Sequence, residues 1–420
     1  MHSSVRRVLR VFLGDTEVGI IGLIGSDTSR FSFSTDYRED IARPTLSQSF
    51  YANDRLVKRD YTSTLALPEF FSNLLPEGEL RIYLANQNKV KPFREFFLLR
   101  ALGEDLPGAV RVEEDQSFLD GSEDEDEGDA EKQSSASDPH MNEDRLQFSL
   151  AGVQLKFSAL VNASGGLTIP TSGMGGYWIV KLPSAYFKNL PVNEYHMMDF
   201  ARRIGIDVPE TKLVSMEEIE GIPQNFLNNE QQALAVRRFD RSTNGDERTH
   251  VEDFAQVFSV YPEKKYDEYN YNSIARIINE RCPIADLEEY IRRLVFNLAI
   301  GNSDMHLKNW SLIYRDTRTP ELSPAYDLVC TTAELEDPKI ALRLGEKKNY
   351  IDITHHEFQN LAVEAGCLKQ LVKKTVNETV EKIISVWPGK RLEIQHLTRI
   401  VDTIDTNLKE VPVLRNARVD

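Results

Sequence analysis

The spacing of hydrophobic and polar residues at the start of the chain predicts two short strands within residues 5–24, joined by a turn at Gly14. Residues 64–85 then have helical spacing with a Pro-Glu-Gly break, and a second helix is predicted over 93–103. A short strand follows this helix. We therefore expect residues 1–112 to form an N-terminal α/β subdomain.

Strand patterns dominate the segment 146–239. Apolar runs at 146–161, 177–184 and 231–241 predict strands, the first of them broken by a turn of small residues. One amphipathic helix is predicted between these strands, over 192–206.

The pattern becomes helical in residues 240–420. One β interruption is predicted in this segment, within residues 310–329. The order of elements predicts an α+β fold in which a mostly β lobe precedes an all-helical lobe. The predicted helices, each with one apolar face, cover residues 250–261, 271–282, 286–302, 356–367, 369–387 and 391–411.

Residues 113–145 differ from the segments on both sides. Residues 113–131 contain eleven acidic residues and no basic one. Such a segment cannot bury enough apolar surface to offset the entropy that ordering would remove. We predict a disordered acidic insert, and two interpretations remain open, a solvated linker and an acidic interaction arm.

Length and composition limit the class of protein. A chain of 420 residues with 41% hydrophobic and 28% charged residues is typical of a soluble globular protein of two or three domains. The net charge of −16 argues against strong DNA binding by the chain alone. No apolar segment is long enough to cross a bilayer, and Arg10 and Asp15 interrupt the one candidate signal peptide, so no membrane partner is expected. Cys282, Cys330 and Cys367 lack zinc-ligand spacing, which favours a reducing, cytoplasmic compartment.

A polar stretch, NSDMHLKN at residues 302–309, stands between two apolar segments. A surface turn is one interpretation, because Asn, Ser and Asp are common in turns. A catalytic loop is the other, because Asp304 and Asn309 have the spacing with which kinases place a base and a magnesium ligand. Asp327 follows a predicted strand and turn and would be a second magnesium ligand. The ordered set of three favours the catalytic loop.

The β-rich segment contains residues that would complete a nucleotide site. Lys181 lies in an apolar run, where an unpaired charge is costly, and Glu194 follows on the next helix. This order matches the Lys–Glu pair that positions ATP phosphates, although a lysine at a strand end that reaches solvent is the alternative. Backbone groups from Arg237 to Phe239 are hinge candidates for adenine, and Asp240 is a candidate for ribose. An edge strand running into a turn is the alternative there.

A candidate phosphate loop lies between the first two strands of the same segment. It has one glycine where a general glycine-rich loop has three, but backbone amides in such a turn suit phosphate. These pieces together predict a two-lobed kinase-like fold that binds ATP and Mg²⁺. The loop runs Ser149-Leu150-Ala151-Gly152-Val153-Gln154-Leu155-Lys156.

In this order the segments resemble the HipA family of serine/threonine kinases, the toxins of bacterial type II toxin–antitoxin pairs. The stretches FFSNLLPEG and LLRALGEDLPGAVRV are similar to the family's N-terminal subdomain. The kinase core of the family is similar to SLAGVQLKFSAL, WIVKLP, VNEYHMM, ALAVRRFDR, NSDMHLKNWS and LSPAYDLV.

The resemblance implies roles for individual residues. Ser149 would be an autophosphorylated serine whose modification expels the phosphate loop and silences the enzyme, Asp304 the catalytic base, and Asn309 and Asp327 the magnesium ligands. Implied substrates are proteins, notably an aminoacyl-tRNA synthetase, whose modification halts translation. The implied partner is a helix-turn-helix antitoxin that binds operator DNA. Residues assigned to ATP binding are Ala151, Gly152, Val153, Gln154, Leu155, Lys156, Lys181, Glu194, Arg237, Arg238, Phe239, Asp240, His306, Leu307, Lys308, Asn309, Tyr326 and Asp327.

The chain departs from the family pattern at Met305, where the loop often has glycine, and at Arg237, where relatives are often acidic. Since the backbone would contact adenine, we expect Arg237 to be tolerated. His306 has two open roles, acid–base or metal chemistry and bracing of the loop. Lys308 either neutralises phosphate charge or is exposed. The acidic insert directly precedes Ser149, which gives the hypothesis that it alters access to the phosphate loop.

Two other functions remain open. One is a kinase of a lipid or small-molecule hydroxyl, since similar loops occur in such enzymes. The other is a catalytically silent module that binds a nucleotide or the antitoxin.

Overall fold

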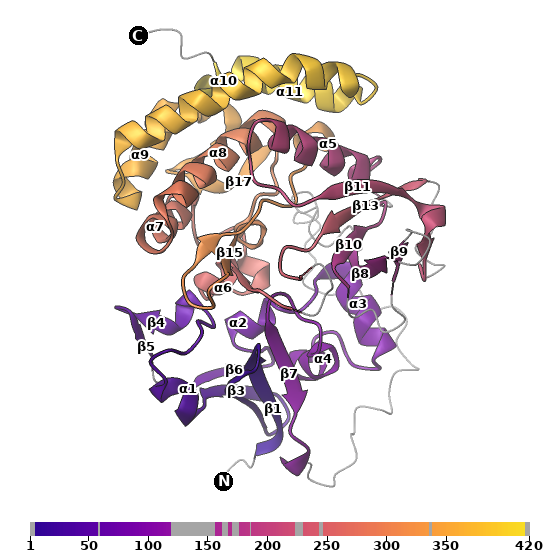
Figure 1. The fold of residues 1–420 in the computed structure, drawn as a ribbon, viewed down its shortest axis with the longest axis vertical. Coiled ribbons are helices and arrows are strands. Elements are labelled where there is room, and N and C mark those ends of the chain that lie inside the picture. Colours follow the sequence, from indigo (N-terminus) through magenta and orange to yellow (C-terminus); the bar gives the residue numbers. More distant parts are fainter. Residues whose placement is uncertain are drawn as a thin grey trace. The chain divides into compact units, whose positions relative to one another are not determined.

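The structure is a computed structural model in which the chain divides into two compact units (Figure 1). The first unit contains Met1–Gln147, Asp240–Lys264 and Ile313–Arg318, and the second contains Phe148–Phe239, Lys265–Leu312 and Thr319–Asp420. The structure describes residues 5–57, 59–118, 156–161, 167–169, 176–184, 186–222, 230–242, 247–335 and 338–415.

An antiparallel five-stranded sheet with the order β6-β3-β2-β1-β7 is central to the first unit. The predicted hairpin is confirmed: β1 pairs with β2 around Gly14, whose φ of +58° lies in the left-handed region that a turn residue without a side chain adopts readily. The strands are β1 (Val5–Leu13), β2 (Thr16–Ile24), β3 (Thr28–Phe33), β6 (Tyr61–Thr64) and β7 (Val110–Glu114), with a separate short pair β4 (Tyr51–Ala52) and β5 (Arg55–Leu56).

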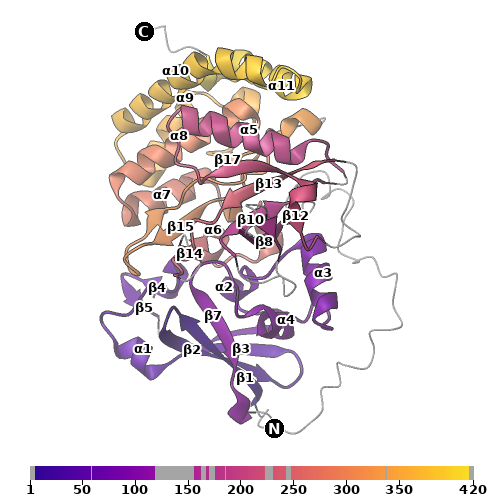
Figure 2. The ribbon, with the colours of Figure 1, turned by 45° about the vertical axis from the view of Figure 1, so that its right-hand side comes forward.

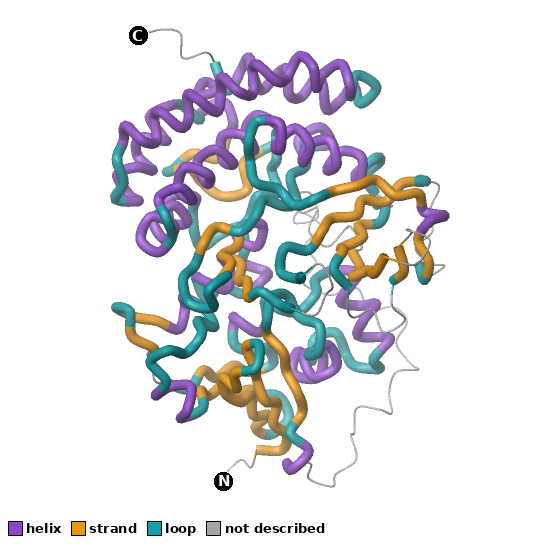
Figure 3. Tube along the Cα trace, in the orientation of Figure 1, coloured by secondary structure: helices purple, strands orange, loops and turns teal. Residues whose placement is uncertain are grey.

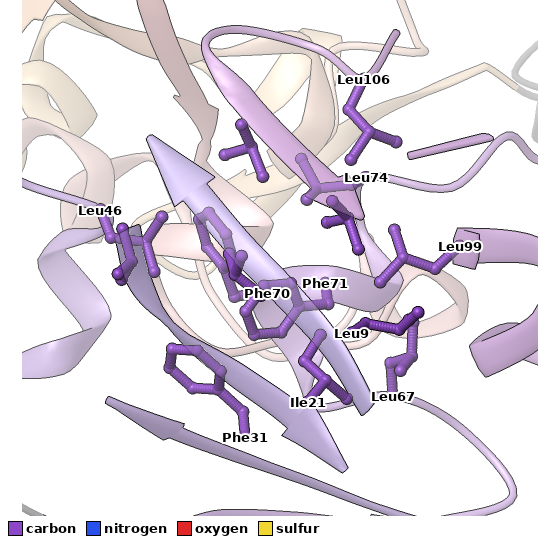
Figure 4. Close-up of a cluster of buried hydrophobic side chains, with 14 of the residues drawn as sticks. Leu9, Ile21, Phe31, Leu46, Leu67, Phe70, Phe71, Leu74, Leu99 and Leu106 are labelled. Carbon is purple, nitrogen blue, oxygen red and sulfur yellow. The ribbon is translucent and has the colours of Figure 1, made fainter. Parts of the chain in front are cut away.

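Helices and strands of this unit share one hydrophobic core (Figure 4). Leu9, Ile21 and Phe31 from the sheet are completely buried together with Phe71 of α2 and Leu99 of α4. Each buried side chain of this size stabilises the fold by about 2 kcal/mol relative to exposure. The helices are α1 (Thr35–Glu39), α2 (Glu69–Ser72), α3 (Gly78–Gln87) and α4 (Glu95–Leu102), and the predicted break separates α2 from α3.

Two predictions for the first unit were wrong in their details. The helix expected over 250–261 is strand β14 (His250–Asp253) followed by a short helix, α6 (Phe254–Val257). Asp253 ends the strand because its side chain caps the helix by accepting from the backbone of Gln256. The acidic insert was expected from residue 113, but β7 continues to Glu114 and a 3₁₀ turn covers Gln116–Phe118. Residues 119–145 lie outside the described part of the chain.

The second unit contains a six-stranded sheet with the order β11-β13-β10-β8-β9-β12 (Figure 2). Helix α5 (Leu190–Arg203) packs against β11 and β13. The apolar runs at 177–184 and 231–241 contain strands, as predicted, and the structure shows that these two strands, β10 and β13, are antiparallel neighbours within the sheet. The strands are β8 (Lys156–Val161), β9 (Leu167–Thr168), β10 (Trp178–Lys181), β11 (Thr211–Ser215), β12 (Ile219–Glu220) and β13 (Gln232–Arg237).

Most of the remaining second unit is helical, as Figure 3 shows in purple. The helix predicted over 391–411 is interrupted, since α10 continues to Glu393 and α11 begins at Thr398. No helix in the described ranges has both the length and the apolar character that a membrane span requires. The helices are α7 (Tyr271–Arg281), α8 (Ile284–Ile300), α9 (His355–Ala365), α10 (Lys369–Glu393) and α11 (Thr398–Glu410).

The predicted α+β fold class is confirmed, but the lobe over residues 240–420 is not all-helical. Strands β15 (Ser311–Tyr314) and β16 (Glu321–Leu322) occupy the expected β interruption. A further hairpin of β17 (Lys339–Leu344) and β18 (Lys347–Asn349) turns at Gly345, whose φ is +58°. The apolar side chains of β17 are buried against α7 and α9, so their pattern does not distinguish strand from helix.

Candidate phosphotransfer site

The candidate site in the second unit is built around one buried ammonium group. Lys181 at the end of β10 is 5% exposed, and its Nζ lies 2.5 Å from Oε1 of Glu194 on α5. The same Nζ donates a hydrogen bond to Oδ1 of Asp327. The pairing predicted from the sequence is therefore present, and the lysine at a strand end that reaches solvent is excluded.

Opposite charges set the ionisation of this group. Burial lowers the pKa of Lys181, but the carboxylates of Asp327 and Glu194 outweigh burial and hold the pKa above its usual value. Burial raises the pKa of Asp327, but Lys156 and Lys181 outweigh it and hold the pKa below its usual range. Burial raises the pKa of Glu194, with Lys181 opposing it. At neutral pH the site thus holds a charged lysine against an ionised Asp327.

Asp327 has an unusual backbone as well as an unusual environment. Its φ is +53°, in the left-handed region that non-glycine residues rarely adopt. The carbonyl of Asp327 accepts from Nδ2 of Asn302 at 3.2 Å. A second lysine, Lys156 at the start of β8, lies 3.5 Å from Oδ2. The conformation is fixed by contacts with distant segments of the unit and directs the carboxylate toward both lysines.

The catalytic-loop candidate begins directly after α8. Gly301 ends the helix with φ +68°, and the side chain of Asn302 accepts from the backbone N–H of Asp304 at 3.0 Å. Nδ2 of Asn309 donates to the carbonyl of Asp304 at 2.7 Å, which closes the loop. Asn302 thus connects the loop of Asp304 to the backbone of Asp327. The stretch 302–309 is largely buried, so the surface-turn interpretation is excluded.

The Asp304 carboxylate is 8% exposed and accepts a hydrogen bond from the hydroxyl of Tyr266 at 2.5 Å. Burial raises the pKa of Asp304 to about 7, although the Tyr266 hydrogen bond and Lys265 lower it. A carboxylate with this pKa takes up a proton near neutral pH, as a general base must. Sequence reasoning missed Tyr266, which precedes Asp304 by 38 residues.

The residues available for a metal ion are oxygen donors. Asn309 uses its amide nitrogen within the loop, so Oδ1 is the atom that remains for a cation. The Asp327 carboxylate and one amide oxygen suit Mg²⁺, which completes its shell with phosphate and water. Among the described residues no group of three or more His, Cys, Asp and Glu side chains is arranged to hold a metal. The donor set fits Mg²⁺ bound together with a nucleotide.

Several predicted nucleotide residues lie on neighbouring elements of the same unit. The rings of Phe239 and Tyr326 are 5.8 Å apart, and the Tyr326 hydroxyl donates to the carbonyl of Lys308 at 2.9 Å. Arg238 is mostly buried and donates to Oγ of Ser158 at 3.2 Å. The guanidinium of Arg237 lies 4.3 Å from the ring centroid of Tyr177. These contacts occupy both arginine side chains.

Other predicted residues have different surroundings. His306 is buried, with its ring 4.9 Å from that of Tyr266, and Leu307 is completely buried. Asp240 belongs to the first unit, where its Oδ2 accepts from the backbone of Gly108 at 2.9 Å and from Arg241 at 2.8 Å. Its carboxylate is therefore already engaged in an ion pair within that unit. The predicted phosphate-loop residues Ser149, Ala151, Gly152, Val153, Gln154 and Leu155 lie outside the described residues.

Comparison with known proteins gives matches in the N-terminal and the C-terminal parts of the chain. Residues 148–387 match the family model described as HipA-like C-terminal domain, and residues 9–113 match the one described as HipA N-terminal domain. A Sinorhizobium fredii protein named "Putative kinase Y4dM" is 45% identical over 97% of this chain and 98% of its own length. The serine/threonine-protein kinase toxin HipA of Shewanella oneidensis is 26% identical over 78% of this chain and 76% of its own length.

A solved structure has the same fold. The Shewanella oneidensis HipA chain, in a complex of HipA, HipB and operator DNA, matches with a TM-score of 0.72 and 20% identity. The match covers 98% of this chain and 100% of that chain. At this identity the likeness establishes the fold and leaves the site to be argued from this chain's own residues.

Proposed function

The chain belongs to the HipA family, and from that membership we propose that it is an ATP- and Mg²⁺-dependent serine/threonine protein kinase. The observation that carries the proposal is the arrangement of the Lys181–Glu194 pair, Asp327 and Asp304 around one site. Phosphoryl transfer depends mainly on positioned charges and an oriented base, and the buried, hydrogen-bonded positions of Lys181, Asp327 and Asp304 support their assignment to these roles.

In the proposed reaction a Ser or Thr hydroxyl attacks the γ-phosphorus of ATP, the bond to the β-phosphate oxygen breaks, and ADP leaves. Asp304 orients the hydroxyl and receives its proton. Lys181, held by Glu194, binds the α- and β-phosphates. Mg²⁺, which Asn309 and Asp327 would hold, neutralises charge on the phosphate oxygens when bound.

Further nucleotide contacts follow from the resemblance. The backbone from Arg237 to Phe239 is proposed to bind adenine, and Tyr326 is proposed to lie against the nucleotide. Residues 306–308 of the catalytic loop are proposed to lie next to its phosphates. Because His306 is buried in contact with the ring of Tyr266, we favour its bracing role. Lys156 is proposed to bind phosphate with the amides of residues 151–155.

We propose that the chain acts in the cytoplasm as the toxin of a type II toxin–antitoxin pair. Its partner would be a helix-turn-helix antitoxin, and the two would bind operator DNA together, as the Shewanella oneidensis complex does with HipB. The proposed substrate is an aminoacyl-tRNA synthetase, whose phosphorylation stops translation. Autophosphorylation of Ser149 would silence the enzyme.

A kinase of lipids or small molecules is the second candidate, and one observation disfavours a lipid acceptor. A hollow of about 170 Å³ lies beside Tyr266, the residue that contacts the proposed base. Acidic and basic groups line it together, among them Asp267, Glu268, Arg343 and Lys348. Such a lining suits a polar polypeptide segment and disfavours an acyl chain, which gains nothing from charged walls.

The testing experiment is incubation of the purified chain with Mg-ATP, followed by phosphate mapping by mass spectrometry. Asp304→Asn is the matched control, since it keeps the shape of the side chain and removes the base. Phosphate on Ser149 in the unsubstituted chain alone supports the active, self-silencing kinase. Absence of phosphate together with absence of Mg-ATP binding would refute the proposal.

The acidic insert has its own test. Deleting residues 115–140 should change the rate of Ser149 phosphorylation if the insert alters access to the phosphate loop. An unchanged rate would contradict this hypothesis.

A further inference from the structure

Helix α5 connects the proposed phosphotransfer site to a second charged cluster. Glu194 lies on this helix next to Lys181, and Asp199 follows five residues later. At 1.5 Å per residue the two positions are about 7.5 Å apart along the helix axis. Because a helix moves as a stiff element, a rotation or shift imposed at Asp199 also moves Glu194.

The second cluster is centred on Lys390 of α10, whose side chain is only 1% exposed. Its Nζ donates to Oδ2 of Asp199 at 2.6 Å and lies 3.2 Å from Nδ1 of His196. Oε2 of Glu393 is 3.5 Å away. A buried ammonium is strongly destabilising unless it is paired and hydrogen-bonded, so its position is specified by these groups.

Neighbouring contacts complete the link between α5 and α10, which lie next to each other in Figures 1 and 2. Arg203 pairs with Asp199 at 2.9 Å and contacts Glu393 through two hydrogen bonds of 2.5 and 3.0 Å. The ring of Phe200 lies 5.6 Å from that of Trp387 on α10. Arg203 is 40% exposed, whereas Lys390 is buried, so Lys390 is the more strictly positioned cation.

The protonation states of His196 and Asp199 allow both side chains to accept hydrogen bonds from the ammonium of Lys390. Burial, followed by the charge of Lys390, lowers the pKa of His196 to about 4. The imidazole is therefore neutral at pH 7, and its Nδ1 is able to accept a hydrogen bond from the ammonium. Burial raises the pKa of Asp199, but Lys390 and Arg203 outweigh it and hold the pKa below its usual value.

We propose that Lys390 is a positioning residue of the kinase site, which fixes α5 through Asp199 and His196 and thereby holds Glu194 against Lys181. This inference rests on the proposed function, because it concerns the pair that would bind ATP phosphates. In the described part of the chain the ammonium of Lys390 contacts His196, Asp199 and Glu393 and neither Glu194 nor Lys181, so it would act through the helix. The competing explanation is that the cluster only stabilises the fold.

A double-mutant cycle separates these explanations. Lys390→Met, Glu194→Gln and the double variant are compared with the unsubstituted chain for Mg-ATP affinity by calorimetry and for the midpoint of urea unfolding. We expect Lys390→Met to weaken ATP binding about fivefold to tenfold, within the range of couplings carried through packed elements. In the Glu194→Gln background Lys390→Met should add little, because the pathway through Glu194 is already lost.

Three further variants, on α10 and α5, accompany the double-mutant cycle. Lys374→Met removes an exposed α10 lysine, 64% exposed, and should leave ATP affinity unchanged. Lys390→Arg keeps the charge and should restore much of the affinity. If Lys390→Met does not fold, Asp199→Asn removes the same ion pair from the α5 side. A lower unfolding midpoint with unchanged ATP affinity overturns the inference, as does an affinity loss of equal size in both backgrounds. Failure of the unsubstituted chain to bind Mg-ATP would instead refute the proposed function, and this inference with it.

Discussion

Glu252 makes the stability of the first unit depend on pH in a direction that the structure specifies. The side chain, on β14, is 1% exposed. Its Oε1 accepts a hydrogen bond from the backbone of Gln48 at 3.0 Å and another from the hydroxyl of Tyr314. Burial raises the pKa of Glu252 to about 7 from its ordinary 4.5, and these hydrogen bonds only partly oppose the shift.

The sign of the effect follows from proton binding. Between pH 4.5 and about 7 the folded protein holds a proton on Glu252 that the unfolded chain has lost. Stability therefore falls as the pH rises through this window, and the loss is complete above about pH 7. A shift of this size corresponds to about 3 kcal/mol, at 1.36 kcal/mol for each pKa unit.

Glu252→Gln removes the ionisation and keeps an oxygen acceptor for Gln48 and Tyr314. The free energy of unfolding of both proteins is measured by urea denaturation at pH about 5 and about 8.5, values chosen to bracket most of the predicted titration. The variant should gain about 2.5 kcal/mol relative to the unsubstituted chain between these pH values, because pH 5 already lies above the unfolded pKa. Any constant cost of burying the new amide group appears at both pH values and cancels from this difference.

A second buried group, His250, also titrates but does not affect the comparison of the two proteins. Burial lowers the pKa of His250 to about 4, so it also contributes a pH dependence to stability. That contribution is present in both proteins and cancels when they are compared. A difference between the variant and the unsubstituted chain that is the same at both pH values would refute the reasoning about Glu252.

Three further substitutions test separate contacts. Lys181→Met leaves the carboxylates of Glu194 and Asp327 without their shared ammonium, so it should reduce the free energy of unfolding by about 3 to 5 kcal/mol in urea denaturation. It should also abolish Mg-ATP binding in calorimetry. An unchanged free energy of unfolding would contradict the buried ion pair. Gly301→Ala places a methyl group against the side chain of Thr332 at a residue whose φ is +68°. It should lower the free energy of unfolding by at least about 1 to 2 kcal/mol and slow phosphorylation. A fully active variant would contradict the requirement for glycine. Thr354→Ala removes the capping box of α9 and should lower the free energy of unfolding by about 1 kcal/mol without changing Mg-ATP affinity. A loss of affinity would show that the cap affects the site.

Local patterns in the sequence determined most individual elements. The alternation in β1 and β2 and the apolar faces of α5, α7 and α8 depend on residues close together in the chain, so the sequence was sufficient to predict them. It also predicted the pairing of Lys181 with Glu194, because an isolated charge in an apolar run requires a partner.

The remaining features depend on contacts between residues that are far apart in the sequence. Arg241 and the backbone of Gly108 contact the carboxylate of Asp240, and no local pattern in the sequence indicates these contacts; its predicted role at ribose stays a prediction. The sequence pattern singled out no role for Lys390, yet its side chain is buried and pairs with Asp199 of α5. Residues 250–253 form a strand although their spacing is compatible with a helix. In each case the free energy of burial and pairing is set by residues far away in the sequence, so only the tertiary structure determined the outcome.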